Sequence, residues 1–282
     1  MHFKIRNRRG LLFTILIILG TGVIIGTMLL RNNVVVPINQ LQIKAEPHLT
    51  SQTVGTVQRG DRVQIITKDD QWAQVVAQHQ KIGWVPNWLL KNHPQLKTAT
   101  KLAEATIILD PGHGGNDSGA LANSNQPEKK YTLQFAQQVA TNLRARGANV
   151  ILTRAQDQTV GLKRRPQIAQ KHHADLFVSF HFDSSPIPNS ASGFTTYYYH
   201  QGTAKQFAQA VNQRFTQLGM ENKGVKFGDY LVIRDSKIPA ILLEMGYINN
   251  DLDFQKIKNP TFRKAVASDV TAGIANYVNT ND

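Results

Sequence analysis

The sequence of 282 residues contains no cysteine. This absence excludes a disulfide framework, catalysis by a thiolate and any zinc site with cysteine ligands. A metal ion bound to this chain must therefore be held by histidine and carboxylate side chains.

Acidic residues are few compared with basic ones. The chain has 19 aspartates and glutamates against 32 lysines and arginines, which gives a net charge of +13 at pH 7. This charge favours partners that carry phosphate or carboxylate groups, such as nucleic acid, anionic lipid or anionic wall polymers. The basic residues are scattered and form no single basic arm, so we expect no nucleic-acid partner.

Charge is missing altogether from residues 10–30, a run that follows Arg8 and Arg9 and is closed by Arg31. About 20 apolar residues cross the hydrocarbon core of a membrane as a helix, and a preceding basic cluster stays in the cytoplasm. We therefore predict a cytoplasmic basic segment at residues 1–9, a single-pass transmembrane anchor at residues 10–30, and an extracytoplasmic remainder in the cell membrane.

A cleaved signal peptide is the alternative interpretation of this run. The run is longer than the apolar part of a typical signal peptide, and residues 27–30 lack the small-x-small cleavage pattern. These features favour an uncleaved anchor. If the segment were cleaved, the protein would be secreted.

Residues 38–92 are typical of a small all-β domain. Short apolar or alternating runs are separated by turn signals such as Gly60-Asp61 and Asp69-Asp70, which indicates a small barrel. The pattern resembles a bacterial SH3-like domain in residues 55–57 followed by Gly60-Asp61, then Trp72, and then residues 83–85. That resemblance implies binding to cell wall, although we interpret Trp72 as part of the barrel core.

Residues 93–104 are polar and are predicted to be a linker. In residues 105–282, strand-like and helix-like segments alternate, which predicts a layered α/β domain with a mostly parallel six-stranded sheet flanked by helices. The predicted strands are residues 107–109, 149–153, 176–180, 194–199, 230–233 and 240–243, and the predicted helices are residues 128–146, 162–173, 203–218 and 260–278.

Three of these strands end in residues that can carry chemistry. His113 follows the first strand through Asp110-Pro111-Gly112, His181 follows the third strand, and Glu244 follows the last. Working residues in open α/β sheets gather at the carboxyl ends of strands. Glu128, at the start of the first long helix, can reach the same edge, so we expect the four side chains to lie together.

Two imidazoles and one carboxylate form the open three-ligand set of catalytic zinc. A second carboxylate that is not a ligand can take a proton from water and give one to a departing nitrogen. Asp110 either hydrogen-bonds a ligand imidazole or caps the end of its strand, and the sequence leaves both roles open.

Residues 106–277 resemble the zinc-dependent N-acetylmuramoyl-L-alanine amidases of the third amidase type. Two positions depart from the pattern of that family: Phe182 follows His181 where a small residue is usual, and Lys223 precedes Gly224 where arginine is common. The resemblance is carried by residues 108–115, Asp117, residues 119–120, Glu128-Lys129, residues 152–154, Leu162, Arg165, residues 174–179, His181, residues 224–226 and residues 243–250.

The resemblance implies that His113, Glu128 and His181 bind Zn²⁺ and that Glu244 is the catalytic carboxylate. It implies a cell wall hydrolase that cuts the amide between the lactyl group of N-acetylmuramic acid and L-alanine in peptidoglycan. The expected partners are then peptidoglycan, anionic wall polymers and, through the N-terminal helix, the membrane. No oligomeric state follows from the sequence.

Two alternative functions remain open at this point: a zinc peptidase acting within the stem peptide, and a non-catalytic wall-binding scaffold. The roles of Arg154 and Arg165 are also open. These arginines either bind a peptide carboxylate or pair with Asp157 or Asp175 to fix loops.

Overall fold

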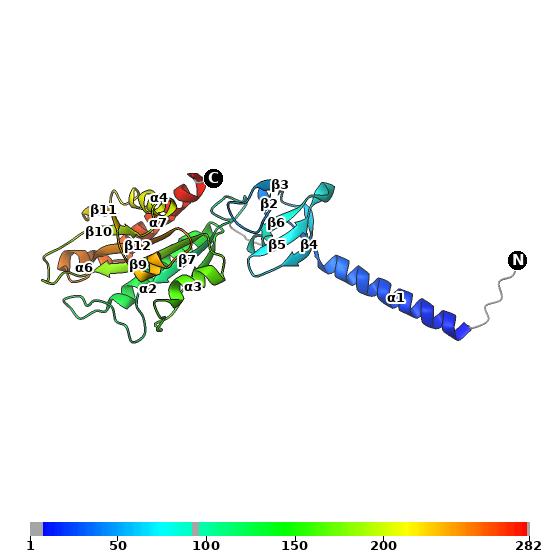
Figure 1. Ribbon diagram of the computed structural model, residues 1–282, viewed down its shortest axis with the longest axis horizontal. Coiled ribbons are helices and arrows are strands. Elements are labelled where there is room, and N and C mark those ends of the chain that lie inside the picture. The colour runs from blue at the N-terminus through cyan, green and yellow to red at the C-terminus, as the bar shows by residue number, and fades with distance from the viewer. Residues whose placement is uncertain (1–7, 92–95, 281–282) are drawn as a thin grey trace. The chain divides into compact units, whose positions relative to one another are not determined.

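The computed structural model describes residues 8–91 and 96–280 (Figure 1). The chain divides into two compact units. Unit 1 comprises Met1–Pro47 and Gln52–Asn92, and unit 2 comprises His48–Ser51 and His93–Asp282. The fold of each unit follows from its own sequence pattern.

Unit 1 begins with helix α1 (Arg8–Arg31), which covers the predicted anchor. Within the described part of the chain, no helix reaches the length and hydropathy that a membrane crossing requires. The predicted transmembrane anchor and the single-pass membrane location are therefore wrong.

The rest of unit 1 is a six-stranded antiparallel sheet of order β1-β4-β5-β6-β2-β3. Trp72 is buried as predicted, and its ring meets that of Trp88 edge to face at 6.4 Å. The strands are β1 (Asn33–Val35), β2 (Leu41–Lys44), β3 (Thr53–Val57), β4 (Arg62–Lys68), β5 (Trp72–Val76) and β6 (Ile82–Pro86), and short 3₁₀ helices lie at Gln78–Gln80 and Asn87–Leu90.

Unit 2 contains a six-stranded sheet of order β11-β10-β12-β9-β7-β8. Its strands are β7 (Thr106–Pro111), β8 (Asn149–Leu152), β9 (Leu176–Asp183), β10 (Phe194–Tyr198), β11 (Asn222–Phe227) and β12 (Ala240–Tyr247). Strands β8, β7, β9 and β12 pair in parallel, but β10 pairs antiparallel with β12. β10 in turn pairs in parallel with β11, so these two strands run opposite to the other four. The predicted mostly parallel sheet is therefore corrected to a mixed sheet.

The reversal of β10 has a local cause. Parallel strands need a long crossover that carries the chain back to the other end of the sheet. Residues 184–193, between β9 and β10, contain no helix, so the chain re-enters the sheet at the same end and runs back.

The fifth predicted strand is also misplaced. Residues 230–233 belong to a loop and to the short helix α5 (Leu231–Arg234), and the strand is β11 instead. A short apolar run fits a buried strand and a buried helix turn equally well, so periodicity cannot separate them.

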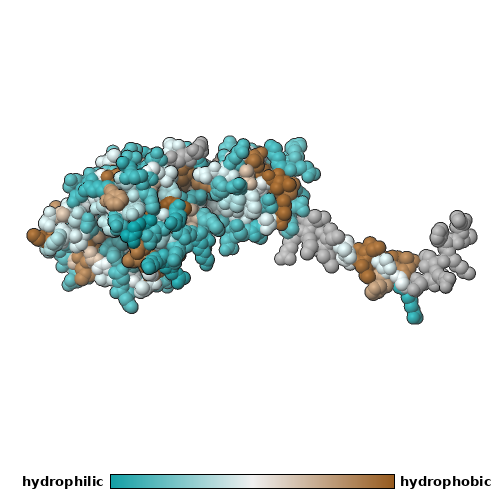
Figure 2. All heavy atoms as spheres, viewed as in Figure 1, coloured by the Kyte–Doolittle hydropathy of each residue, from teal (hydrophilic) through white to brown (hydrophobic). Residues whose placement is uncertain are grey.

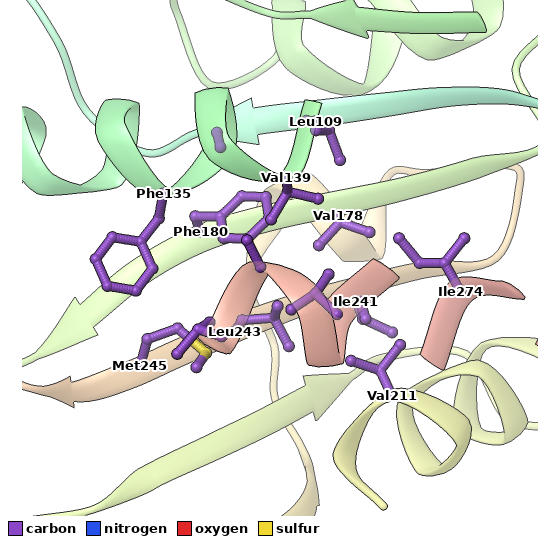
Figure 3. Packing of buried hydrophobic residues seen from close by; sticks show 14 of the residues in the cluster. Leu109, Phe135, Val139, Val178, Phe180, Val211, Ile241, Leu243, Met245 and Ile274 are labelled. Carbon is purple, nitrogen blue, oxygen red and sulfur yellow. The ribbon is translucent and has the colours of Figure 1, made fainter. Parts of the chain in front are cut away.

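Helices cover both faces of the sheet, as the alternating pattern predicted. On one face, α2 (Glu128–Ala145), α4 (Thr203–Asn212) and α7 (Pro260–Thr280) bury a large apolar core, which includes Phe135 and Ile274 (Figure 3). On the other face, α3 (Arg164–Lys171) and α5 enclose a smaller cluster around Phe177 and Leu242. A further helix, α6 (Asp251–Ile257), precedes α7. Hydrophilic side chains dominate the surface of unit 2 that Figure 2 displays.

Candidate metal and catalytic site

Strand pairing brings His181 and Glu244 together. β9 and β12 are parallel neighbours, and Glu244 lies opposite His181 in their register. Successive side chains alternate between the faces of a sheet. His181 and Glu244 therefore share the face of Phe177 and Leu242, which α3 and α5 cover.

His113 reaches the same place from β7. The backbone N–H of Gly112 donates to the carbonyl of Phe180 at 3.0 Å, which holds the turn before His113 against β9. The rings of His113 and His181 then lie 4.8 Å apart between centroids. A Cβ atom at Gly112 would lie 2.3 Å from the nearest atom of the His181 ring, so this close approach requires glycine.

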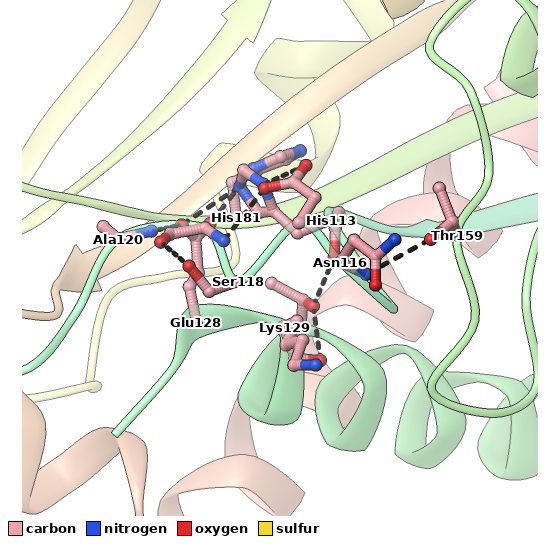
Figure 4. A network of polar contacts seen from close by, with 12 residues as sticks. His113, Asn116, Ser118, Ala120, Glu128, Lys129, Thr159 and His181 are labelled. Atoms are coloured by element: carbon pink, nitrogen blue, oxygen red, sulfur yellow. Dashed lines mark hydrogen bonds and ion pairs between the residues drawn. The ribbon is translucent and has the colours of Figure 1, made fainter. Parts of the chain in front are cut away.

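Glu128, the first residue of α2, lies between the two imidazoles (Figure 4). Its Oε2 is 3.1 Å from His113 Nε2, and its Oε1 is 3.1 Å from His181 Nδ1. The backbone N–H groups of Ala120 and Phe182 also donate to this carboxylate, each at 2.9 Å. Burial acts to raise the pKa of Glu128, but the hydrogen bonds and charges of the two imidazoles hold it well below its ordinary value.

The ligand atoms of His113, Glu128 and His181 all lie within 4.8 Å of one another, which is close enough to hold a metal ion. Asp117 Oδ2 lies 2.9 Å from His113 Nδ1, which leaves Nε2 facing Glu128. Asp117 thus supports the imidazole of His113, a role that the sequence analysis had offered to Asp110.

Asp110 is instead fully buried beneath the loop that carries His113. It accepts hydrogen bonds from Thr153 Oγ1 at 2.5 Å, Ser179 Oγ at 2.7 Å and Arg165 at 2.8 Å. Of the two roles that the sequence left open, capping the end of its strand is therefore the closer one. Asp110 fixes the end of β7 to the two neighbouring strands.

The two arginines hold this loop by its backbone. Arg165 donates to the carbonyls of Pro111 and His113, and Arg154 donates to the carbonyls of Pro111 and Gly112. Both side chains are buried, at 1% exposure for Arg154 and 2% for Arg165. Their donors are thus occupied inside the protein, and the ion partner of Arg165 is Asp110, not Asp175.

Glu244 is buried, and its Oε2 has no hydrogen-bond partner among the described residues. Burial, together with the negative charges of Glu128 and Asp183, raises the pKa of Glu244 well above its ordinary value. A carboxyl group of this kind binds a proton more readily than an ordinary glutamate, which suits a group that accepts and returns protons near neutral pH.

These four side chains line one cleft of about 390 Å³, together with Asp183 and Tyr230. Sequence reasoning missed both of these additional residues. Asp183 lies two positions after His181 on β9, so strand alternation could have found it. Tyr230 lies in the loop before α5, where no signal in the sequence points toward the cleft.

Comparisons with known proteins agree with this geometry. The family described as N-acetylmuramoyl-L-alanine amidase matches residues 107–276, and the bacterial SH3 domain family matches residues 39–91. The chain is 32% identical to the probable cell wall amidase LytH of Staphylococcus aureus over 248 residues, which cover 84% of this chain and 81% of that protein.

Solved structures give the same result for unit 2. An N-acetylmuramoyl-L-alanine amidase from Clostridium difficile 630 aligns with a TM-score of 0.61 and 31% identity, covering 63% of this chain and 98% of that one. The catalytic domain of the amidase CwlV from Bacillus (Paenibacillus) polymyxa var. colistinus aligns with a TM-score of 0.60 and 33% identity, covering 63% and 99%. The chain therefore belongs to the N-acetylmuramoyl-L-alanine amidase family, and it is a peptidoglycan amidase.

Proposed function

We propose that this amidase depends on zinc and that His113, Glu128 and His181 hold the metal. One observation carries the proposal: the His/Glu/His cluster shares its cleft with a buried carboxyl oxygen that has no partner among the described residues. The donor set fits zinc, because two imidazoles and one carboxylate leave a fourth position free for water or substrate.

When bound, zinc supplies a Lewis acid that polarises the scissile carbonyl and lowers the pKa of a water molecule to about 7. The protein prepares its ligands for that task. Asp117 holds the His113 ring by Nδ1, and the N–H groups of Ala120 and Phe182 fix the Glu128 carboxylate. Ligands held in this way lose little freedom when the metal binds.

Glu244 is proposed as the general base and acid. It accepts a proton from the water that attacks the carbonyl of the lactyl group, and it returns a proton to the alanine nitrogen as the C–N bond breaks. Water is consumed, and a muramoyl carboxylic acid and a free peptide amine are formed. The raised pKa of Glu244 makes both transfers accessible near neutral pH.

The domain roles are part of this proposal. Residues 105–282 carry the catalytic site, residues 93–104 link it to residues 38–92, and the SH3-like residues 38–92 bind wall material. The net charge of +13 supports attraction to anionic wall polymers.

The direct test is zinc-dependent release of soluble peptides from purified cell wall. Mass spectrometry should find intact stem peptides that begin with a free L-alanine amine, and the release should stop with a chelator and resume with zinc. Fragments cut within the stem peptide would indicate the peptidase alternative. Binding without release would indicate the scaffold alternative.

We expect the zinc affinity of the protein to fall at acidic pH. Burial acts to lower the pKa of His113, but Glu128 and Asp117 outweigh it and raise this pKa above 6.5. Zinc binds the neutral imidazole, so a protonated His113 must lose its proton before the metal binds. The zinc affinity should therefore fall by up to about 10-fold for each pH unit below that pKa. Competition with a chromophoric chelator between pH 8 and pH 5 measures this slope, and a flat profile would contradict the prediction.

A further inference from the structure

Gly115, two residues after His113, is held by both of its backbone groups. Its N–H donates to Asp157 Oδ1 at 2.7 Å, and its carbonyl accepts from Lys129 Nζ at 2.7 Å. Lys129 Nζ also donates to Asp157 Oδ2 at 2.7 Å. The three residues thus form a closed ring of hydrogen bonds, which we call the Gly115 clasp.

The clasp joins three separate segments of unit 2. Gly115 belongs to the loop that carries His113, Lys129 follows Glu128 in the first turn of α2, and Asp157 lies in the loop after β8. The Gly115 loop lies close against that last loop, because a Cβ atom at Gly115 would come within 2.6 Å of the backbone nitrogen of Thr159. The clasp therefore connects the segments of two of the three proposed metal ligands.

The conformation at His113 makes such a connection useful. His113 has φ of +61°, in the left-handed region that residues other than glycine seldom occupy. A loop in this conformation needs support from its surroundings to stay in place. Part of that support comes from Arg165, which donates to the carbonyl of His113 at 2.9 Å. The clasp holds the same loop two residues further along the chain, at Gly115.

Neither charged member of the clasp belongs to the reaction site. Lys129 and Asp157 are not among the residues that line the cleft. Asp157 is 56% exposed and Lys129 is 21% exposed, so their ion pair is partly open to solvent. Exposed pairs of this kind add little to the free energy of unfolding. Three short, charge-assisted hydrogen bonds can nevertheless fix local geometry closely.

We propose that the Gly115 clasp is a positioning device that sets the separation of His113 and Glu128 and thereby the affinity and geometry of metal binding. This inference rests on the proposed zinc site. Ligand distances in metal sites are expected to lie within about 0.2 Å of their standard values. A clasp that restrains both ligand segments acts on that separation without touching the metal or the substrate.

The test compares Lys129→Met, Asp157→Asn and the double variant with Lys130→Met. Lys130 is a suitable control because it lies on the same helix turn and donates to Gln126 Oε1 at 3.1 Å, outside the clasp. Zinc affinity is measured by competition with a chelator, the visible spectrum of the Co²⁺-loaded protein reports coordination geometry, and thermal unfolding of the metal-free protein reports stability.

Each clasp variant should bind zinc about 10–100-fold more weakly, as partners of metal ligands typically do when replaced. The double variant should lose less than the product of the two single losses, because the residues act as one unit. The Co²⁺ spectrum should change in the clasp variants only, metal-free unfolding should shift little, and Lys129→Arg should recover part of the affinity.

Unchanged zinc affinity and an unchanged Co²⁺ spectrum in the clasp variants would overturn the inference. A loss of affinity matched by an equal loss in metal-free stability would also overturn it, because the clasp would then be merely structural. These failures differ from a failure of the proposed zinc site, in which the wild-type protein itself would bind no metal in the cleft.

Discussion

Replacing Glu244 by glutamine should lower kcat by about 10²–10⁴-fold and leave the zinc affinity of the protein nearly unchanged. Glutamine has almost the same shape as glutamate, so the cleft should keep its form. Its amide cannot accept a proton from the attacking water at any accessible pH. The loss should therefore fall on turnover and not on metal or wall binding.

The surroundings of Glu244 explain why the substitution should change turnover without disturbing the rest of the cleft. Its Oε2 has no hydrogen-bond partner in the described part of the chain, so glutamine breaks no bond at that atom. The change also removes a group that Glu128 and Asp183 repel. Peptide release from cell wall, together with metal content by elemental analysis, measures both effects. A variant with near-normal kcat and bound zinc would exclude Glu244 as the general base.

The meeting of His113, His181 and Glu244 could be predicted because it follows from one rule about sheets. Each residue lies at the carboxyl end of a buried strand, and these strands turned out to be the parallel neighbours β7, β9 and β12. The antiparallel strand β10 did not disturb the prediction, because it contributes none of the four residues. The sheet is mixed where a mostly parallel one was predicted. The strands whose carboxyl ends carry His113, His181 and Glu244 are nevertheless parallel, as the prediction required.

Other features depend on contacts that no local pattern encodes. From the sequence, Asp110 was the candidate partner of an imidazole, but in the structure Asp117 contacts His113, in the loop closed by the bridge between Gly114 and Asp117. The contact of Gly115 with Asp157 spans 42 positions. The N-terminal helix, Arg8–Arg31, begins and ends close to the predicted bounds, but no helix in the described part of the chain is long and apolar enough to cross a membrane.

Replacing Glu128 by glutamine should have the opposite signature to the same change at Glu244. The Glu128 carboxylate faces four nitrogen atoms, those of Ala120, Phe182, His113 and His181. A glutamine side chain has one acceptor oxygen, and its NH₂ group must then face the backbone N–H of either Ala120 or Phe182. One buried donor is left without an acceptor, and the proposed metal site loses its only anionic ligand.

We expect zinc affinity to fall by more than about 100-fold in the Glu128→Gln variant, beyond the range typical of residues that only support a ligand. The unpaired buried donor should cost about 1–3 kcal/mol of metal-free stability at neutral pH.

The pKa of Glu128 is lowered in the folded state, so the contribution of this carboxylate to the free energy of unfolding is present above the unfolded pKa and fades as pH falls. The stability gap to the wild type should therefore narrow below about pH 4.3, the ordinary value for glutamate. Chelator competition and urea unfolding at two pH values measure these effects. If the two Glu→Gln variants lost metal equally, the separate roles assigned to the two glutamates would be wrong.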